Sequence, residues 1–94
     1  MNQLLCVGII GDFDSSYPSH LATNEALRHA ARALSVALDY TWLLTPRLDD
    51  ASSETTLRQF DALWCAPGSP YKSMNGALRA IRFAREKDWP FIAT

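Results

Sequence analysis

The chain has 94 residues, which allows one domain at most. Hydrophobic residues make up 48% of it, enough for a core, and its net charge of -1 excludes the basic surface that nucleic-acid binding requires. The apolar run near the start, LLCVGII, is too short to span a membrane and lacks the flanks of a secretory signal. We therefore expect a cytoplasmic protein with neither a membrane nor a nucleic-acid partner. No cysteine or histidine spacing indicates a metal site, and no cofactor is expected.

The first predicted element is a strand over residues 4–11, LLCVGIIG, a continuous apolar run that ends at Gly11. Such a run is typical of a parallel strand that is buried on both faces. A helix is predicted next, from Ser19 to about Leu38, with Ser19 or Thr23 as its N-terminal cap. Helical spacing predicts that its apolar face consists of Leu27, Ala30, Ala31, Leu34, Ala37 and Leu38.

Three further elements are predicted in the middle of the chain. Residues 38–45, LDYTWLLT, are rich in aromatic and branched side chains and predict a second strand. A short helix within residues 52–60 would present Leu57 and Phe60 to the core. Residues 61–68, DALWCAPG, predict a third strand that a proline and a glycine bring to an end.

The last two predicted elements are a clear amphipathic helix and a strand. The helix runs from about Met74 to Lys87, and the strand, PFIAT, begins at Pro90. The apolar positions of the helix are Met74, Ala77, Leu78, Ile81 and Ala84, and its outer face carries Arg79, Arg82, Arg85 and Glu86. The arginines are interpreted as a solvated face.

This alternation of strands and helices predicts a three-layer α/β fold of the flavodoxin-like kind. Its mostly parallel sheet would have about four strands, joined by right-handed crossovers. In such folds ligands bind beyond the carboxyl ends of the strands. Three loops lie there: GDFDSSYPSH, TPRLDD and APGSPYKSMNG.

The first of these loops carries two carboxylates, Asp12 and Asp14, which could together bind Mg²⁺. We favour the simpler interpretation, a polar loop between a strand and a helix. A response-regulator receiver would need an aspartate at the end of the third strand, where residues 66–68 read Ala-Pro-Gly, so that class is rejected. Cys6 and Cys65 lie inside apolar runs and are expected to be free thiols, with a disulfide as the less favoured alternative.

Several segments, in order, resemble the class I glutamine amidotransferases, and the resemblance is strongest to the glutaminase domain of CTP synthases and their stand-alone relatives. These segments are VGIIGDF and NEALRHAARAL in the first third, and then DALWCAPG, AIRFARE and PFIAT. The resemblance covers almost the whole chain. It implies that residues 1–94 are the N-terminal part, somewhat under half, of one glutaminase domain, and that the sheet is incomplete.

The resemblance also implies where the chemistry lies. In the family, an apolar strand like PFIAT leads into the nucleophilic cysteine, so we expect that cysteine just after Thr94. The histidine and glutamate of the triad come much later in the family, so no catalytic residue is expected within these 94 residues. Cys6, Cys65, His20 and His29 do not match triad positions.

One loop is expected to contribute to the substrate site. The family's glycine after the strand-ending proline corresponds to Gly68, which is expected to give a backbone N–H to the oxyanion hole. Ser69 and Pro70 follow it as candidate substrate-binding residues and depart from the family, which has a second glycine there. Pro70 also lacks a backbone donor, which predicts a different amide substrate or weaker binding.

Two functions are carried forward from the sequence. The first is hydrolysis of glutamine to supply ammonia, performed by the intact protein but not by these 94 residues alone. The alternative is a non-catalytic α/β binding or interaction module. The edge of the strand PFIAT would be exposed in such a half-domain, which favours pairing with a second copy and hence a homo-oligomer.

Overall fold

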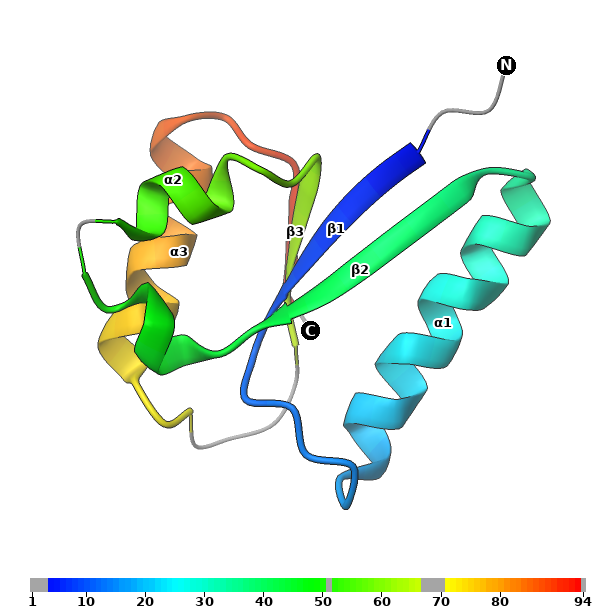
Figure 1. The fold of residues 1–94 in the computed structure, drawn as a ribbon, viewed down its shortest axis with the longest axis horizontal. Helices are drawn as coiled ribbons and strands as arrows, with labels where there is room; N and C mark the ends of the chain where they lie inside the picture. Colours follow the sequence, from blue (N-terminus) through cyan, green and yellow to red (C-terminus); the bar gives the residue numbers. More distant parts are fainter. Residues whose placement is uncertain (1–3, 51, 67–70, 94) are drawn as a thin grey trace.

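The computed structural model describes residues 4–50, 52–66 and 71–93. Their elements follow the predicted order of strands and helices (Figure 1). In chain order these are β1 (Leu4–Ile10), α1 (Pro18–Leu34), β2 (Ala37–Leu43), the 3₁₀ helix η1 (Thr45–Leu48), α2 (Ser53–Leu57), β3 (Ala62–Cys65), α3 (Met74–Glu86) and β4 (Phe91–Ala93).

The described strands form one four-stranded sheet in the order β2-β1-β3-β4, and every neighbouring pair is parallel. Helix α1 covers one face, and α2 and α3 cover the other (Figure 1). The predicted three-layer α/β fold is thus confirmed. Because the chain moves outward from β1 to β2 and then returns past β1 to β3, the strand order reverses between β1 and β3. In open α/β sheets this reversal marks the place where ligands bind.

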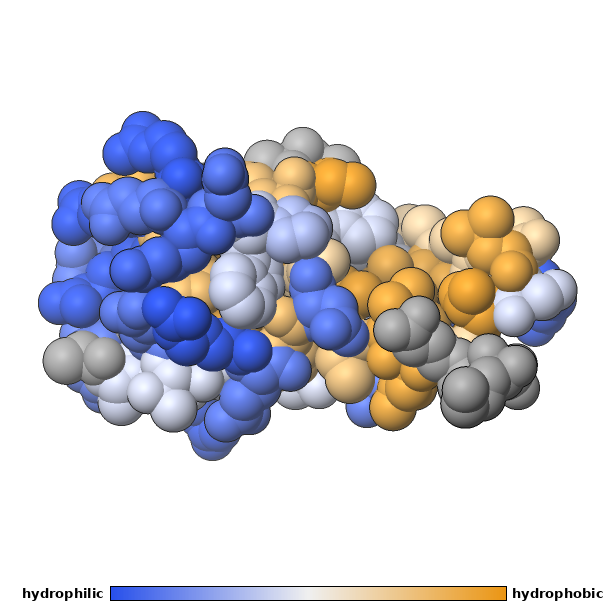
Figure 2. Space-filling view, turned by 90° about the horizontal axis from the view of Figure 1, so that it is seen from above, coloured by the Kyte–Doolittle hydropathy of each residue, from blue (hydrophilic) through white to orange (hydrophobic). Residues whose placement is uncertain are grey.

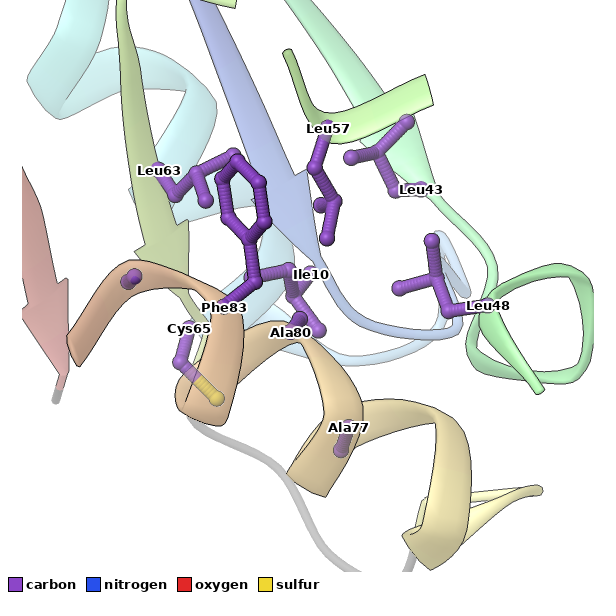
Figure 3. Packing of buried hydrophobic residues seen from close by; sticks show 10 residues of the cluster. Ile10, Leu43, Leu48, Leu57, Leu63, Cys65, Ala77, Ala80 and Phe83 are labelled. Atoms are coloured by element: carbon purple, nitrogen blue, oxygen red, sulfur yellow. The ribbon is translucent and has the colours of Figure 1, made fainter. Parts of the chain in front are cut away.

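Both faces of the sheet are buried around the end of β1. Ile9 and Ile10 are both fully buried, and because successive strand residues face opposite sides, they enter two different clusters. The larger cluster lies under α2 and α3, where Phe83 approaches Leu57 and Leu63 (Figure 3). The prediction that the first strand is buried on both faces therefore holds at its carboxyl end.

Helix α1 is shorter than its sequence pattern predicts. It ends at Leu34 because Ser35 takes a left-handed conformation with φ of 54°, and the N–H groups of Ser35 and Val36 bond back to the last carbonyls. Ala37 and Leu38, predicted to be helical, instead belong to β2. The predicted caps were also wrong, since Tyr17 occupies the cap position and Pro18 starts the helix, where its missing N–H costs nothing.

The apolar faces of the helices were predicted only in part. On α1, Leu27 is buried but Ala30 and Leu34 are exposed, and the buried positions of its first half are polar: His20, Thr23 and Asn24. On α3, Ala77 and Ala84 are buried as predicted, whereas Met74 and Leu78 are exposed. Gly76, Ala80 and Phe83 complete the packing face of α3. Helix α3 comes closest to η1 at Gly76, where a side chain would meet the carbonyl of Thr45.

Hydrophobic surface remains on the α1 side of the molecule. An apolar groove of about 430 Å³ lies between α1 and the pair β3–β4, with Leu27, Trp64 and Ile92 among its lining residues. Viewed from above, polar residues cover the α2–α3 end, while hydrophobic residues gather toward the opposite end (Figure 2). None of the helices in the described ranges is long and apolar enough to cross a membrane.

Candidate functional site

The carboxyl ends of β1, β2 and β3 are joined by the carboxylate of Asp12, the second residue after β1. One carboxylate oxygen, Oδ1, accepts a hydrogen bond from the backbone N–H of Thr45 at 2.9 Å. The other, Oδ2, accepts from the Thr45 hydroxyl at 2.7 Å and from the backbone N–H of Lys72 at 2.8 Å. Asp12 thus ties the loop after β1 to the loops after β2 and β3, which is more than the polar linker that the sequence favoured.

Thr45 extends this connection to the start of α3. It is fully buried, and its hydroxyl oxygen accepts the backbone N–H of Ser73 at 2.9 Å. The Ser73 hydroxyl caps α3 by accepting the N–H of Gly76 at 3.1 Å, and it donates to Asp49 at 3.1 Å. Asn75 also donates to the Asp49 carboxylate. Sequence reasoning missed Thr45 and Ser73, although Ser73 three residues before Gly76 is a recognisable cap position.

Both backbone polar groups of Ala66, the first residue of the loop after β3, form hydrogen bonds. Its N–H donates to the carbonyl of Ile10 at 3.0 Å, and its carbonyl accepts the hydroxyl of Tyr71 at 2.8 Å. The same hydroxyl lies 3.0 Å from the Cys65 sulfur. Burial of the phenol, followed by its contact with Cys65, raises the pKa of Tyr71, so the hydroxyl stays protonated and able to donate.

A cluster of aromatic rings surrounds His20 in the first turn of α1. The ring is buried, and its Nδ1 accepts the backbone N–H of Asp14 at 3.0 Å. The rings of Phe13, Tyr17 and Trp42 pack around it with centroid distances between 4.9 and 6.0 Å. The accepting Nδ1 requires the proton of a neutral ring to sit on Nε2. His20 thus holds the loop after β1 against α1.

The pKa of Asp12 is lowered from its ordinary value of 3.8. Burial opposes this shift, but the hydrogen bonds from the Lys72 N–H and from Thr45 stabilise the carboxylate more strongly. The pKa of Asp14 is lowered by the N–H and hydroxyl of Ser16, which lie in its own loop. Both groups are ionised at neutral pH. The Asp12 carboxylate bonds to residues of two other loops, whereas the Asp14 carboxylate bonds to Ser16 in its own loop.

These lowered pKa values predict a loss of stability in acid. Because the folded-state pKa of Asp12 lies below the unfolded value, its contribution is present above about pH 4 and is lost as the pH falls through the folded-state pKa. We expect the free energy of unfolding, measured by urea titration from about pH 7 to about pH 2, to fall in that acidic range. Asp12→Asn should flatten this decline. If the free energy of unfolding of Asp12→Asn fell with pH as steeply as that of the wild type, Asp12 would not be a source of the acid sensitivity.

The site residues that the sequence proposed are not placed by the structure. Gly68, Ser69 and Pro70 lie outside the described residues, as does Pro67, whereas Ala66 and Tyr71 on either side are described. In the described ranges no hydrogen bond joins a cysteine to a histidine: Cys65 contacts Tyr71, and His20 bonds to Asp14. Both cysteines are free, as expected, and no group of three metal-ligating side chains occurs among the described residues.

Comparison with known proteins shows what this chain is similar to. The chain is 35% identical over 86 residues to CTP synthase from Prochlorococcus marinus strain MIT 9215, and 31% identical over 86 residues to CTP synthase from Synechococcus sp. strain CC9902. The chain resembles a segment of CTP synthase. In both comparisons the match covers 92% of this chain but only 16% of the relative. No family model matches the sequence.

The fold carries the same resemblance. The glutaminase domain of Trypanosoma brucei CTPS, solved with bound acivicin, superposes with a TM-score of 0.82 over 95% of this chain and 35% of that chain. Sequence identity in this comparison is 17%, so the superposition shows a shared fold. Together with the sequence matches, it confirms the expected resemblance to the glutaminase domain of CTP synthase.

Proposed function

We propose that these residues are the N-terminal part of a glutaminase domain of the class I amidotransferase type, and that the intact protein hydrolyses glutamine to supply ammonia. The observation that carries this proposal is the match of 86 residues to CTP synthase, in a fold shared with a glutaminase domain. The acivicin bound to that domain, a glutamine analogue, supports a glutamine-binding role for the corresponding surface here.

The proposed chemistry needs groups from outside the 94 residues. A cysteine thiol, expected just after Thr94, would pass its proton to a histidine and attack the side-chain carbonyl of glutamine, and the protonated histidine would then give that proton to the departing amine. The tetrahedral intermediate would expel ammonia and leave a thioester, which water then hydrolyses. Gly68 is proposed to donate its N–H to the oxyanion, and Ser69 and Pro70 to contact the substrate. These 94 residues alone are proposed to be inactive.

The place of the loop after β3 supports this assignment. Ala66 and Tyr71 lie where the strand order reverses, and β4 ends beside β3, with Cys65 of β3 paired to Ala93 of β4. A nucleophile that follows β4 would therefore emerge next to the loop that contains Gly68. A nucleophile and an oxyanion donor must lie side by side, so the pairing of the two strand ends supports the proposal.

The proposal is tested with the complete natural polypeptide that contains residues 1–94. We expect its gene to encode a cysteine within one or two codons after Thr94, and the purified protein to release ammonia from glutamine. A serine in place of that cysteine should abolish the release, and acivicin should inhibit it. The absence of ammonia release from the folded complete polypeptide would overturn the proposal.

The apolar groove beside β4 favours a second candidate, a non-catalytic interaction module. Ile92 is 59% exposed on a strand whose outer edge is unpaired among the described residues, and such an edge favours addition of another chain. A homo-oligomer through this edge stays a prediction, as does the cytoplasmic location. Sedimentation of the 94-residue chain tests the predicted homo-oligomer. A concentration-dependent dimer that Ile92→Lys abolishes would support the homo-oligomer, and a monomer at all concentrations would contradict it.

A further inference from the structure

We propose that the outer edge of β2 binds the extended C-terminal segment of a partner protein. The segment adds a strand parallel to β2, and Arg47 holds its terminal carboxylate. Two features of the fold carry this proposal: a seven-residue strand with one unpaired edge, and a pocket at the carboxyl end of that strand. The inference does not depend on the proposed glutaminase activity.

Strand β2 is an outer strand of the described sheet, with β1 as its neighbour (Figure 1). The Leu43 carbonyl accepts the N–H of Gly11, so the backbone groups of Leu43 face β1. Because these groups alternate in direction along a strand, those of Leu38, Tyr40 and Trp42 point outward. Within the described ranges no hydrogen bond uses them. The edge thus offers donors and acceptors to a further strand.

The edge of β2 lacks the features that usually protect a sheet edge from added strands. Strand β2 pairs with β1 over all seven residues without a bulge, and it contains neither proline nor lysine. Asp39 is its only charged residue, and the same alternation turns the backbone of Asp39 toward β1. The other outer strand, β4, has three residues and directly follows Pro90. An added strand therefore finds the longer template at β2.

A pocket of about 260 Å³ lies at the carboxyl end of β2, where η1 and α2 follow the strand. Its lining includes three leucines, two threonines and one arginine: Leu43, Leu44, Leu48, Thr41, Thr56 and Arg47. The leucines suit an apolar last side chain of the bound segment, and the threonine hydroxyls and the guanidinium suit a carboxylate. The pocket thus combines the two features by which a chain end is recognised.

Arg47 decides the direction of the added strand. It is exposed, and its guanidinium forms no ion pair or hydrogen bond with any described residue. A guanidinium can bind a carboxylate through two parallel N–H···O bonds. A strand parallel to β2 brings its C-terminal carboxylate to Arg47, whereas an antiparallel strand brings its positively charged N-terminus there. Charge complementarity therefore favours the parallel strand.

The test uses the 94-residue chain and the N-acetylated peptide Thr-Val-Thr-Val-Thr-Leu, whose residue types favour strands. Titration followed by NMR should show saturable binding. The largest amide shifts are expected at Tyr40 and Trp42, whose N–H groups point outward, and smaller shifts at Thr41 and Leu43, which face β1. The same peptide with a C-terminal amide should bind at least about tenfold more weakly, because it lacks the charge that Arg47 holds.

Arg47→Gln should weaken binding of the carboxylate peptide about tenfold and leave binding of the peptide amide unchanged. Arg79→Gln, at an exposed arginine of α3, is the matched control and should change neither affinity by more than about twofold. The peptide amide changes no residue of the protein, so that comparison holds even if Arg47→Gln fails to fold.

Three results would overturn the inference. The first is a lack of saturable binding up to about 1 mM peptide. The second is equal binding of the carboxylate peptide and the peptide amide, which would mean that the edge accepts any extended segment rather than a chain end. The third is a peptide-free dimer in which the Tyr40 and Trp42 amides are already protected from exchange, because a second copy of the chain would then occupy the edge of β2.

Discussion

Gly76→Ala should destabilise the protein by about 2 kcal/mol or more, although alanine is the better helix former. Gly76 lies in the first turn of α3 and is buried against η1. A Cβ built on it would overlap the carbonyl oxygen of Thr45, a backbone atom that cannot rotate away. The gain in helix propensity is about 1 kcal/mol, whereas forcing extra volume into a packed contact costs about 1–3 kcal/mol or more. The overlap is severe, so the steric cost should win.

Urea titration of the 94-residue chain measures this effect, with Met74→Ala as the control. Met74 is exposed in the same turn of α3, so its replacement tests helix propensity without touching η1. We expect Met74→Ala to change the free energy of unfolding by less than about 0.5 kcal/mol. A Gly76→Ala variant more stable than wild type would show that η1 and α3 can separate at little cost.

The same substitution should also disturb the bonds that Thr45 makes to Asp12. The carbonyl that Gly76→Ala would push belongs to Thr45, whose N–H and hydroxyl bond to Asp12. The glycine thus permits the close contact between α3 and η1 that holds Thr45 in place. The packing of α3 and the position of Thr45 are therefore coupled at this one residue.

Regular elements were predicted from sequence where the hydrophobic pattern matched the observed burial. The continuous apolar run of β1 reflects burial on both faces, so Ile9 and Ile10 were correctly assigned to the interior. The short helix α2 was predicted with Leu57 facing the core, and Leu57 is fully buried. The exposed arginines of α3, Arg79, Arg82 and Arg85, were also predicted correctly.

The errors share a physical cause. The spacing of apolar residues along a helix indicates which face is hydrophobic, but not how closely another element approaches that face or which polar partners it offers. On α3 the large residues Met74 and Leu78 were assigned to the packed face but are exposed, whereas the closest contact with η1 is made at Gly76. On α1 the buried positions include His20 and Asn24, because the partners available there are polar: the N–H of Asp14 for His20 and the indole N–H of Trp42 for Asn24.

The candidate site was predictable only in location. Parallel strands bring their carboxyl ends to one edge, so the loops that contain Asp12, Thr45 and Lys72 were expected to meet there. The bonds between them depend on which backbone N–H groups the loops turn inward, and no side-chain pattern encodes that. From the sequence, Asp12 and Asp14 therefore suggested either a pair of metal ligands or a plain polar loop. In the structure, the Asp12 carboxylate bonds to Thr45 and Lys72, whereas the Asp14 carboxylate bonds to Ser16 in its own loop.

Ile10→Ala should destabilise the 94-residue chain by about 2–5 kcal/mol, the cost of truncating a fully buried isoleucine. Ile10 lies at the centre of the cluster between the sheet and α3 (Figure 3). Small domains are stable by only about 5–15 kcal/mol, so much of that stability would be lost. Because the Ile10 carbonyl also accepts the N–H of Ala66, the loop after β3 should loosen before the chain unfolds globally. Urea titration and amide exchange at Ala66 measure the two effects.

Ile92→Ala is the matched control for this experiment, since it makes the same chemical change at a residue that is 59% exposed. Its cost should stay below about 1 kcal/mol if the groove beside β4 is open to water. A cost near that of Ile10→Ala would mean that another chain covers β4 in solution, and it should then depend on protein concentration. In the complete polypeptide the cost of Ile92→Ala should rise without such a dependence, because a following segment of the same chain would cover that face. The pair therefore distinguishes a half-domain completed by its own chain from a module completed by a partner.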